Sequence, residues 1–187
     1  MTDTSVETVV ERIHDRVTPT DDERERLHAV ADRLRERARD AITDLGIDAD
    51  VRLVGSTARE TWLAGDRDID LFVRFPPNLS RADLERYGLQ VGHAVVPDGH
   101  EEFAEHPYVK GEVDGFAVDC VPCFAVESAG DIQSAVDRTP FHTEYLEDGL
   151  DADLRAAARV TKAFWRATAG YGPDSRTRGL PGYPGEC

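Results

Sequence analysis

The sequence has few cysteines, no long apolar run and almost no lysine, and each shortage narrows what the chain can be. Three cysteines cannot form a disulfide framework, and Cys120 and Cys123 have no second Cys or His pair at zinc spacing. We therefore expect them to be ordinary core thiols. No apolar stretch is long enough to cross a bilayer, and the N-terminus lacks a signal-peptide pattern. These absences predict a soluble, cytoplasmic protein with no membrane partner.

The charge is also unbalanced, with 37 acidic against 22 basic residues and a formal net charge of −15. Only Lys110 and Lys162 are lysines. A nucleic-acid binder normally has a basic balance, so composition alone argues against RNA or DNA as a partner. An acid-rich, lysine-poor surface also keeps a protein hydrated in concentrated salt, where charges are screened within about 3 Å at molar ionic strength. We interpret the acidity as halophilic adaptation, under which local arginine clusters can still hold a polyanion.

Apolar residues recur at helical spacing in two runs at the start of the chain. The first run covers residues 6–17. The second begins after Thr20, which forms a capping-box pattern with Glu23, and ends at Gly46. We expect residues 1–46 to form two helices that pack on the domain that follows.

Residues 47–140 alternate short apolar runs with helical patterns, which predicts an α/β (α+β) fold with a small mixed sheet flanked by helices. Asp114-Gly115 is typical of a tight hairpin turn, and Thr139 before Pro140 is typical of a helix start. The predicted strands are 51–54, 69–75, 109–113 and 116–126. The predicted helical segments are a turn from Gly55 through Leu63, then 80–95, 141–146 and 154–169.

Asp68 and Asp70 stand two residues apart on a predicted strand, so both side chains leave the same face. Two carboxylates this close repel each other unless a cation lies between them, and a hard divalent ion prefers such oxygen ligands. The alternative is that both residues are simply exposed on a polar strand face. Because Leu71, Phe72 and Val73 indicate a buried strand, where unpaired carboxylates are costly, we favour the metal site.

Asp119 is a single acidic residue within an apolar run, so it needs a partner. It either pairs with Lys110 or an arginine, or joins the metal cluster from a neighbouring strand. Gly55-Ser56 follows a strand and precedes a helical turn, a geometry in which backbone N–H groups can approach a phosphate. The same dipeptide is common in ordinary turns, and its significance depends on the carboxylates downstream.

Together, Gly55-Ser56, Asp68-x-Asp70 and Asp119 resemble the signature of the polymerase-β-like nucleotidyltransferases. Longer runs resemble one branch of that superfamily, the archaeal-type (class I) CCA-adding tRNA nucleotidyltransferases. These runs are 55–59, 61–66, 68–70, 105–108, 118–123 and 134–142. The run 134–142 is specific to that branch, and the resemblance covers nearly the whole chain.

The resemblance assigns roles to the matching residues. Asp68, Asp70 and Asp119 would be catalytic and would bind Mg²⁺ as cofactor, with Asp119 helping to activate the tRNA 3′-hydroxyl. The matching nucleotide-binding residues, some of which hold the triphosphate, are Gly55, Ser56, Arg59, His142, Lys162 and Tyr171. Taken without the resemblance, Lys162 would be explained by snorkelling to solvent, and His142 by half-buried packing.

The implied function is addition or repair of the 3′-terminal CCA of tRNA from CTP and ATP, with release of pyrophosphate and without a nucleic-acid template. The partners would be the tRNA 3′ end and the two nucleotides, and the full-length form could be a homodimer. Residues 47–140 would be the catalytic head, with the N-terminal helices packed on it. Residues 141–187 would be the start of a helical central domain that binds nucleotide.

The family's proteins are more than twice as long as this chain. Near its end, Pro181 and Pro184 disfavour the helix that the family has at this point. We therefore expect a truncated chain with impaired activity. Two alternatives stay open: a stand-alone minimal nucleotidyltransferase, and an inactive remnant that binds nucleotide.

Overall fold

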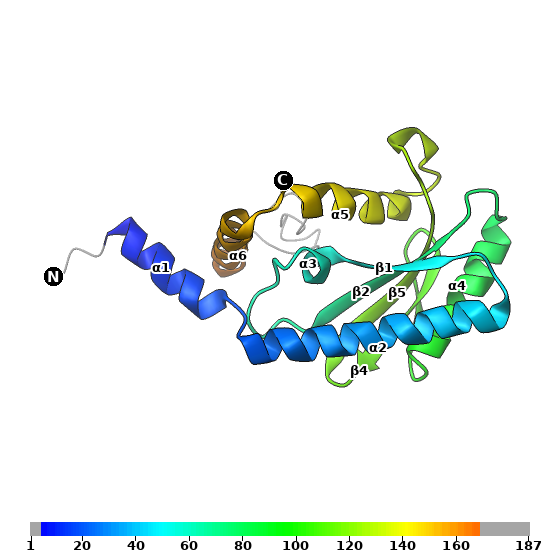
Figure 1. Ribbon diagram of the computed structural model, residues 1–187, viewed down its shortest axis with the longest axis horizontal. Helices are drawn as coiled ribbons and strands as arrows, with labels where there is room; N and C mark the ends of the chain where they lie inside the picture. The colour runs from blue at the N-terminus through cyan, green and yellow to red at the C-terminus, as the bar shows by residue number, and fades with distance from the viewer. Residues whose placement is uncertain (1–4, 169–187) are drawn as a thin grey trace.

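The computed structural model describes residues 5–168, apart from a few side chains in that range, as a mixed sheet with helices on both sides (Figure 1). Tyr171 and the predicted end of the last helix lie outside the described residues. The helices are α1 (Val6–Val17), α2 (Asp21–Leu45), α3 (Gly55–Ala58), α4 (Arg81–Val95), α5 (Arg138–Gly149) and α6 (Ala152–Ala167). The strands are β1 (Asp50–Val54), β2 (Asp68–Phe75), β3 (His100–Phe103), β4 (Pro107–Val113) and β5 (Phe116–Phe124). Two short 3-10 turns, η1 (Ala129–Asp131) and η2 (Ala135–Asp137), precede α5.

The five strands form one sheet in the order β1-β2-β5-β4-β3. β2 and β5 run parallel, and every other neighbouring pair runs antiparallel. Asp114 and Gly115 join β4 to β5 in a hairpin, and both have the positive φ angles that such a turn requires. The mixed sheet and the hairpin confirm the α/β fold expected from the sequence.

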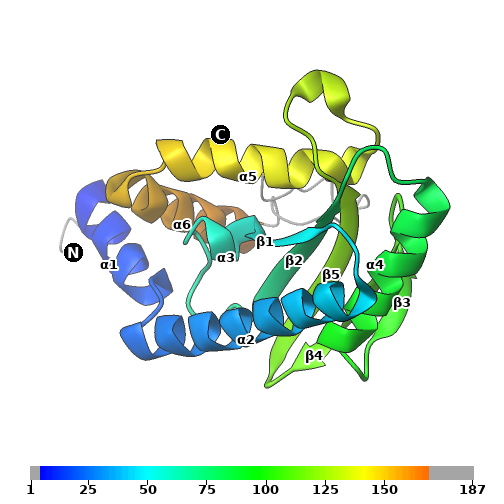
Figure 2. The ribbon, with the colours of Figure 1, turned by 45° about the vertical axis from the view of Figure 1, so that its right-hand side comes forward.

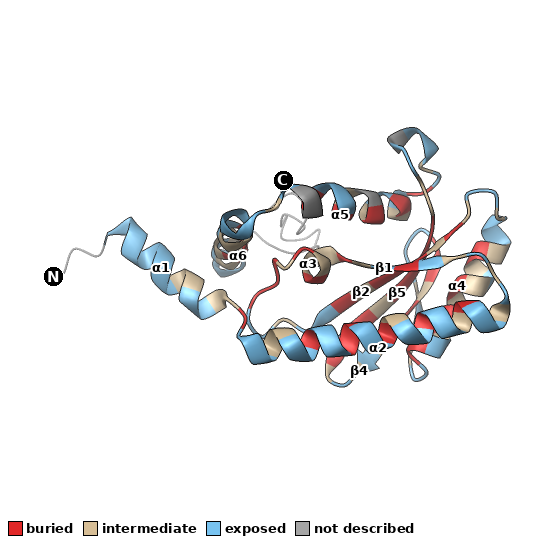
Figure 3. Cartoon of the chain, viewed as in Figure 1, coloured by how far each residue is buried: buried red, intermediate tan, exposed pale blue. Residues whose placement is uncertain are grey.

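The larger apolar core lies between one face of the sheet and the helices α2 and α4 (Figure 3). The buried stripe of α2 is part of the one predicted from its spacing, and consists of Leu27, Val30, Ala31, Leu34, Ala38 and Ile42. A smaller cluster lies on the face turned toward α5 (Figure 2), and consists of Val54, Phe72, Val121 and Cys123. Most of the hydrophobic stabilisation therefore comes from one face, which leaves part of the other available for polar groups.

Cys120 and Cys123 are both buried and free, which confirms that they are core thiols. They stand three residues apart on β5, so their side chains point to opposite faces of the sheet. Cys120 accordingly belongs to the larger core and Cys123 to the smaller cluster. Thiols on opposite faces can neither form a disulfide nor share a metal ion.

The predicted capping signals are mostly confirmed. Thr20 and Glu23 form the capping box of α2, and Gly46 ends that helix in the left-handed conformation. Ser80 caps α4 by accepting a hydrogen bond from the backbone N–H of Asp83. None of the helices between residues 5 and 168 is both long and apolar enough to span a membrane.

The predicted helical turn from Gly55 through Leu63 is too long, because α3 ends at Ala58. Glu60 has a positive φ of 56°, which a helix cannot accommodate. The segment that follows is a loop leading into β2. The sequence prediction was wrong here because many of the contacts that hold this loop come from α6, about a hundred residues away, and others from Val17 and Glu23.

Two further expectations need correction. Thr139 is not the cap of α5, because that helix begins at Arg138, directly after η2. Pro140 therefore lies within the first turn, where its missing N–H costs nothing. β3 was not predicted from the sequence, because its four residues are mostly polar and show no apolar alternation.

The turn before α5 depends on Asp137, a fully buried carboxylate (0% exposed). Its Oδ1 accepts a hydrogen bond from the backbone N–H of Phe124 at 2.8 Å. Its Oδ2 accepts hydrogen bonds from the N–H groups of Gln133 at 3.0 Å and Ser134 at 2.7 Å. One side chain thus satisfies three backbone donors and ties the end of β5 to the start of α5.

We expect Asp137→Ala to lower the free energy of unfolding by about 3 kcal/mol or more, because each buried donor left without a partner costs about 1–3 kcal/mol. Asp137→Asn keeps one carbonyl acceptor and should lose less. Urea unfolding measures both. Asp131→Ala, at an exposed position of η1, is the matched control and should change stability little. Equal losses in Asp137→Ala and Asp131→Ala would contradict this role.

Candidate active site

Asp68, Asp70 and Asp119 share the face of the sheet that the larger core leaves free. Ile69 and Leu71 point into that core, so the two aspartates that alternate with them on β2 point the opposite way. In the parallel pairing of β2 with β5, Asp70 lies directly opposite Asp119. The structure therefore places on one face of the sheet the three carboxylates that the sequence singled out.

The electrostatics of this face favour a bound cation. Burial and the neighbouring charges of Asp119 and Asp68 raise the pKa of Asp70 to about 6. Arg59 and Lys110 act on that pKa in the opposite direction. The pKa of Asp68 is also raised, first by burial and then by Asp66. The carboxylates thus repel one another more than the nearby cations compensate.

Asp119 has a cationic partner in this structure. Lys110 lies on β4, directly opposite Asp119 of β5. Its Nζ is 3.2 Å from one carboxylate oxygen of Asp119 and 3.3 Å from the other. This is one of the two possibilities that the sequence left open. Among residues 5–168, no three acidic, His or Cys side chains converge as a ready-made metal site. A divalent ion would therefore compete with Lys110 for Asp119.

Gly55 places the start of α3 against Asp70. Its φ of +72° is in the left-handed region, and a Cβ atom at this position would collide with Oδ2 of Asp70. Only glycine meets both conditions without strain. Thr57, also on α3, donates its hydroxyl to the carbonyl of Asp68 at 2.7 Å. This short helix therefore contacts both ends of Asp68-x-Asp70, and Thr57 is a contributor that the sequence analysis missed.

Arg59 lies just beyond α3, and only 6% of it is exposed. It donates from Nη1 to the hydroxyl of Thr143 on α5 at 3.4 Å, and it is near enough to lower the pKa of Asp70. Ser56 is half-buried on α3. The structure therefore places Arg59 near Asp70 and Ser56 on the same short helix as Gly55, while the contacts of both residues with a triphosphate stay a prediction.

The loop from Glu60 to Asp66, between α3 and β2, is held by one stripe of cations on α6. The spacing i, i+4, i+7 and i+11 puts the four side chains on one face of that helix. Their contacts are Arg155 to Glu60 Oε2 at 2.7 Å, Arg159 to the Glu60 carbonyl at 2.8 Å, Lys162 to the Thr61 carbonyl and hydroxyl at 3.1 and 3.0 Å, and Arg166 to both oxygens of Asp66 at 2.7 and 3.2 Å.

Lys162 is 2% exposed, so the explanation by snorkelling to solvent is wrong. Its ammonium group ends against Thr61 inside the protein. His142 is half-buried on α5, and Tyr171 lies outside the described residues. The roles of these residues as nucleotide contacts stay predictions. The cationic stripe was visible in the sequence, but its spacing alone resembles an ordinary solvated helix face.

Comparisons with known proteins agree with this geometry. Residues 32–142 match the family model described as a nucleotidyltransferase domain. Three relatives are named CCA-adding enzyme. They come from Halorubrum lacusprofundi (59% identical, 95% of this chain), Halobacterium salinarum (58%, 98%) and Thermoplasma volcanium (40%, 91%). The chain spans only 38–40% of the length of these relatives.

Solved structures show the same fold at low sequence identity. One, titled as a cytoplasmic RNA terminal U-transferase, matches 95% of this chain and 50% of its own with a TM-score of 0.65 and 17% identity. A second, titled as CdnC of E. coli MS115-1 with ATP, matches 95% of this chain and 62% of its own with a TM-score of 0.64 and 18% identity. At these identities the likeness concerns the fold alone.

We expect Gly55→Ala to destabilise the protein more than Gly46→Ala. Both glycines have positive φ, 72° and 62°, so alanine should carry a similar backbone cost at each position, about 1–2 kcal/mol. Nothing lies within 4 Å of a Cβ atom at Gly46, whereas at Gly55 that atom meets Asp70. The overlap should add about 1–3 kcal/mol, measured by chemical unfolding. Equal losses would show that Gly55 does not pack against Asp70.

The raised pKa of Asp70 predicts a pH-dependent cost to stability. An unfolded aspartate ionises near 3.8, whereas Asp70 in the folded protein stays protonated up to about pH 6. Stability should therefore fall as the pH rises from about 4 to about 6, by on the order of 1–3 kcal/mol. Asp70→Asn removes this cost, so its Tm should exceed that of the wild type at pH 7.5 and match it near pH 4.

The matched control is Asp114→Asn, an exposed carboxylate in the hairpin turn where asparagine tolerates the positive φ. Its stability relative to the wild type should not increase between pH 4 and pH 7.5. If the Tm of Asp70→Asn relative to the wild type also fails to rise between pH 4 and pH 7.5, ionised Asp70 does not destabilise the folded protein.

Proposed function

This chain belongs to the nucleotidyltransferase domain family, and on that premise we propose that it transfers nucleotides to the 3′ end of tRNA, adding or repairing CCA from CTP and ATP. The observation that carries the proposal is the shared face of Asp68, Asp70 and Asp119 beside Gly55. The similarity to CCA-adding enzymes over 95% of the chain supports tRNA as the acceptor. We also propose a salt-rich cytoplasm as its location and a homodimer for a full-length form.

We further propose Mg²⁺ as the cofactor, held by Asp68, Asp70 and Asp119. All the donors are carboxylate oxygens, which suit this hard cation, and their mutual repulsion is what a divalent charge would relieve. When bound, Mg²⁺ would stabilise the negative charge that develops on the phosphates. On this view Lys110 holds Asp119 in place until the ion competes for it.

In the reaction, the 3′-oxygen of the acceptor forms a bond to the α-phosphorus of the nucleotide. The bond from that phosphorus to the oxygen bridging to the β-phosphorus breaks, and pyrophosphate leaves. We propose that Asp119 accepts the proton of the attacking hydroxyl. The residues that we assign to the nucleotide are Gly55, Ser56, Arg59, His142, Lys162 and Tyr171.

Two of these assignments rest on particular contacts. Gly55 lets the backbone of α3 lie directly against the carboxylate of Asp70, which keeps the proposed phosphate contact of this turn next to the proposed metal ligands. Lys162 is bonded to Thr61, so in this structure it supports the loop that joins α3 to β2. We propose that it does both: it orders the loop and adds positive charge near the triphosphate.

We also propose a division of the chain into functional parts. Residues 1–46 support the catalytic unit, 47–140 carry the carboxylates, and 141–187 begin a second, nucleotide-binding part. Within this arrangement α5 and α6 already contact the catalytic unit, through Thr143 with Arg59 and through Arg166 with Asp66. These contacts couple the second part to the site.

The test incubates the whole chain in concentrated KCl with Mg²⁺, labelled CTP or ATP, and tRNA lacking its 3′ CCA. We expect label to enter the tRNA, and Asp70→Asn to reduce the rate by about 100-fold or more because a metal ligand is lost. Asp114→Asn should keep the wild-type rate. Omission of Mg²⁺ should abolish transfer.

Two outcomes would contradict the proposal. If the wild-type chain transfers nucleotide to another acceptor but not to tRNA, the acceptor is wrong and a stand-alone nucleotidyltransferase is indicated. If the chain binds nucleotide and Mg²⁺ without any transfer, it is an inactive remnant that only binds nucleotide. If Asp70→Asn still transfers nucleotide at the wild-type rate, the carboxylates do not have the catalytic role proposed here.

A further inference from the structure

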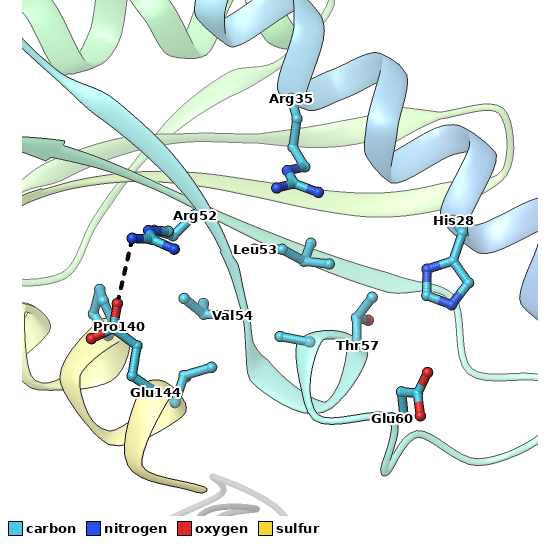
Figure 4. A pocket seen from close by; sticks show the side chains of 11 residues that line it. His28, Arg35, Arg52, Leu53, Val54, Thr57, Glu60, Pro140 and Glu144 are labelled. Carbon is cyan, nitrogen blue, oxygen red and sulfur yellow. Dashed lines mark ion pairs between the residues drawn. The ribbon is translucent and has the colours of Figure 1, made fainter. Parts of the chain in front are cut away.

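A pocket of about 270 Å³ lies at the outer edge of β1, between α2 and α5 (Figure 4). Its walls include Leu53, which faces the larger core, and Val54, which belongs to the smaller cluster, so the pocket opens at the edge of the sheet rather than over one face. None of the three catalytic carboxylates lines it. It is therefore a cavity distinct from the proposed active site.

Arginines from two elements border this cavity. Arg35 of α2 and Arg52 of β1 line it, and both also line an adjoining cavity of about 400 Å³, together with Arg39. We call the two cavities together the edge groove. His28, two turns before Arg35 on the same face of α2, lines the opposite end. In a chain with a net charge of −15, three arginines gather along this groove, which three acidic residues (Asp50, Glu60 and Glu144) also line.

The hydrogen-bonding capacity of these arginines is largely unused. Nε of Arg35 is buried and has no hydrogen-bond partner, and its Nη1 contacts only Asp32, at 3.3 Å. Arg52 forms an ion pair with Glu144 at 3.6 Å, marked by the dashed line in Figure 4, and this distance is too long for a hydrogen bond. The side chain of Arg39 makes no ion pair or hydrogen bond within the described part of the chain; its backbone carbonyl accepts a hydrogen bond from the hydroxyl of Thr43. Guanidinium groups in this condition have donors left for a ligand.

The acidic residues that line the edge groove form ion pairs with other arginines, which lie outside its lining. Asp50 accepts two hydrogen bonds from Arg74, both at 2.7 Å. Glu144 lies 3.6 Å from Arg74 as well as from Arg52. Glu60 pairs with Arg155 at 2.7 Å. Asp32 and Glu144 therefore offset part of the charge of Arg35 and Arg52, whereas the side chain of Arg39 has no acidic partner within residues 5–168.

The chemistry of the lining selects the ligand class. Guanidinium groups match the oxygens of a phosphate with paired donors, and arginine is the residue most suited to such recognition. The rest of the floor is small and apolar, formed by Leu53, Val54, Ala58 and Pro140. A cavity near the lower end of the size range of ligand pockets, with a cationic rim and an apolar floor, fits a sugar phosphate better than a bare anion.

We propose that the edge groove is a second binding site, which takes a phosphate group carried on a nucleotide. The nucleotide can be free or part of an RNA strand. Two of the walls touch residues of the proposed active site: Thr57 bonds to the carbonyl of Asp68, and Thr143 accepts a hydrogen bond from Arg59. An occupant would therefore contact the back of the elements that hold the catalytic face.

The test observes the arginine Nε–H signals of the ¹⁵N-labelled whole chain by NMR, assigned by single Arg→Lys variants. EDTA is present throughout, which suppresses metal-dependent binding at the carboxylates. AMP, pyrophosphate and an eight-nucleotide RNA are the probes. If the site takes a free nucleotide, the signals of Arg35 and Arg52 should shift and saturate with AMP. If it takes a nucleotide within an RNA strand, they should shift with the RNA and not with AMP.

Arg35→Gln combined with Arg52→Gln should weaken binding of the effective probe by about tenfold or more, as expected for lost charge-assisted hydrogen bonds. The matched control is Arg26→Gln with Arg33→Gln, which removes the same charge from α2 at two residues that contact Asp114 instead. This control should keep the affinity within about twofold. The side chains of Arg35 and Arg52 are 34% and 52% exposed, so the variant that changes both should still fold, and thermal melting checks this.

The proposal is overturned if no probe shifts the Arg35 and Arg52 signals. It is also overturned if both double variants weaken binding equally, because general charge would then explain the affinity. Should the first double variant melt early, Arg35→Lys with Arg52→Lys replaces it. These lysines keep the charge but not the forked donors, and we expect an intermediate loss of affinity.

Discussion

The pairing of β2 with β5 is the constraint on which the rest of the site depends. Because the two strands run parallel in a fixed register, Asp70 and Asp119 lie side by side and repel each other. A shift of one residue would turn Asp119 into the apolar core. The larger core resists such a shift, since it buries Ile69, Leu71 and Val118 from the same two strands. Hydrophobic burial on one face thus enforces electrostatic repulsion on the other.

The neighbouring elements compensate that repulsion in different ways. Lys110 neutralises Asp119 from β4, and Arg59 acts on Asp70 from the end of α3. α6 then fixes the loop between α3 and β2 with four cationic side chains, so the loop is ordered without secondary structure of its own. A chain that is acidic overall therefore concentrates arginine and lysine around its candidate catalytic face, and arginine again along the edge groove.

Much of this could be predicted from the sequence, because it depends on local patterns. The alternation on β2 places Asp68 and Asp70 on one face, Asp114-Gly115 sets a hairpin, and the capping box at Thr20 starts α2. The failures share a cause. The end of α3 and the environment of Lys162 are decided by contacts with segments distant in sequence, and β3 forms only because β4 lies beside it.

The sequence by itself determined which residues carry charge, which faces are apolar and which turns require glycine, since these follow from side-chain chemistry and the periods of helix and strand. The resemblance carried by its motifs also pointed to the family. Tertiary structure alone decided that Asp119 lies opposite Asp70, that Lys110 forms an ion pair with Asp119, and that Arg35 and Arg52 border one groove. Such juxtapositions depend on which strands pair and how helices pack. Local periodicity restricts these arrangements, but only the burial of the whole core selects one of them.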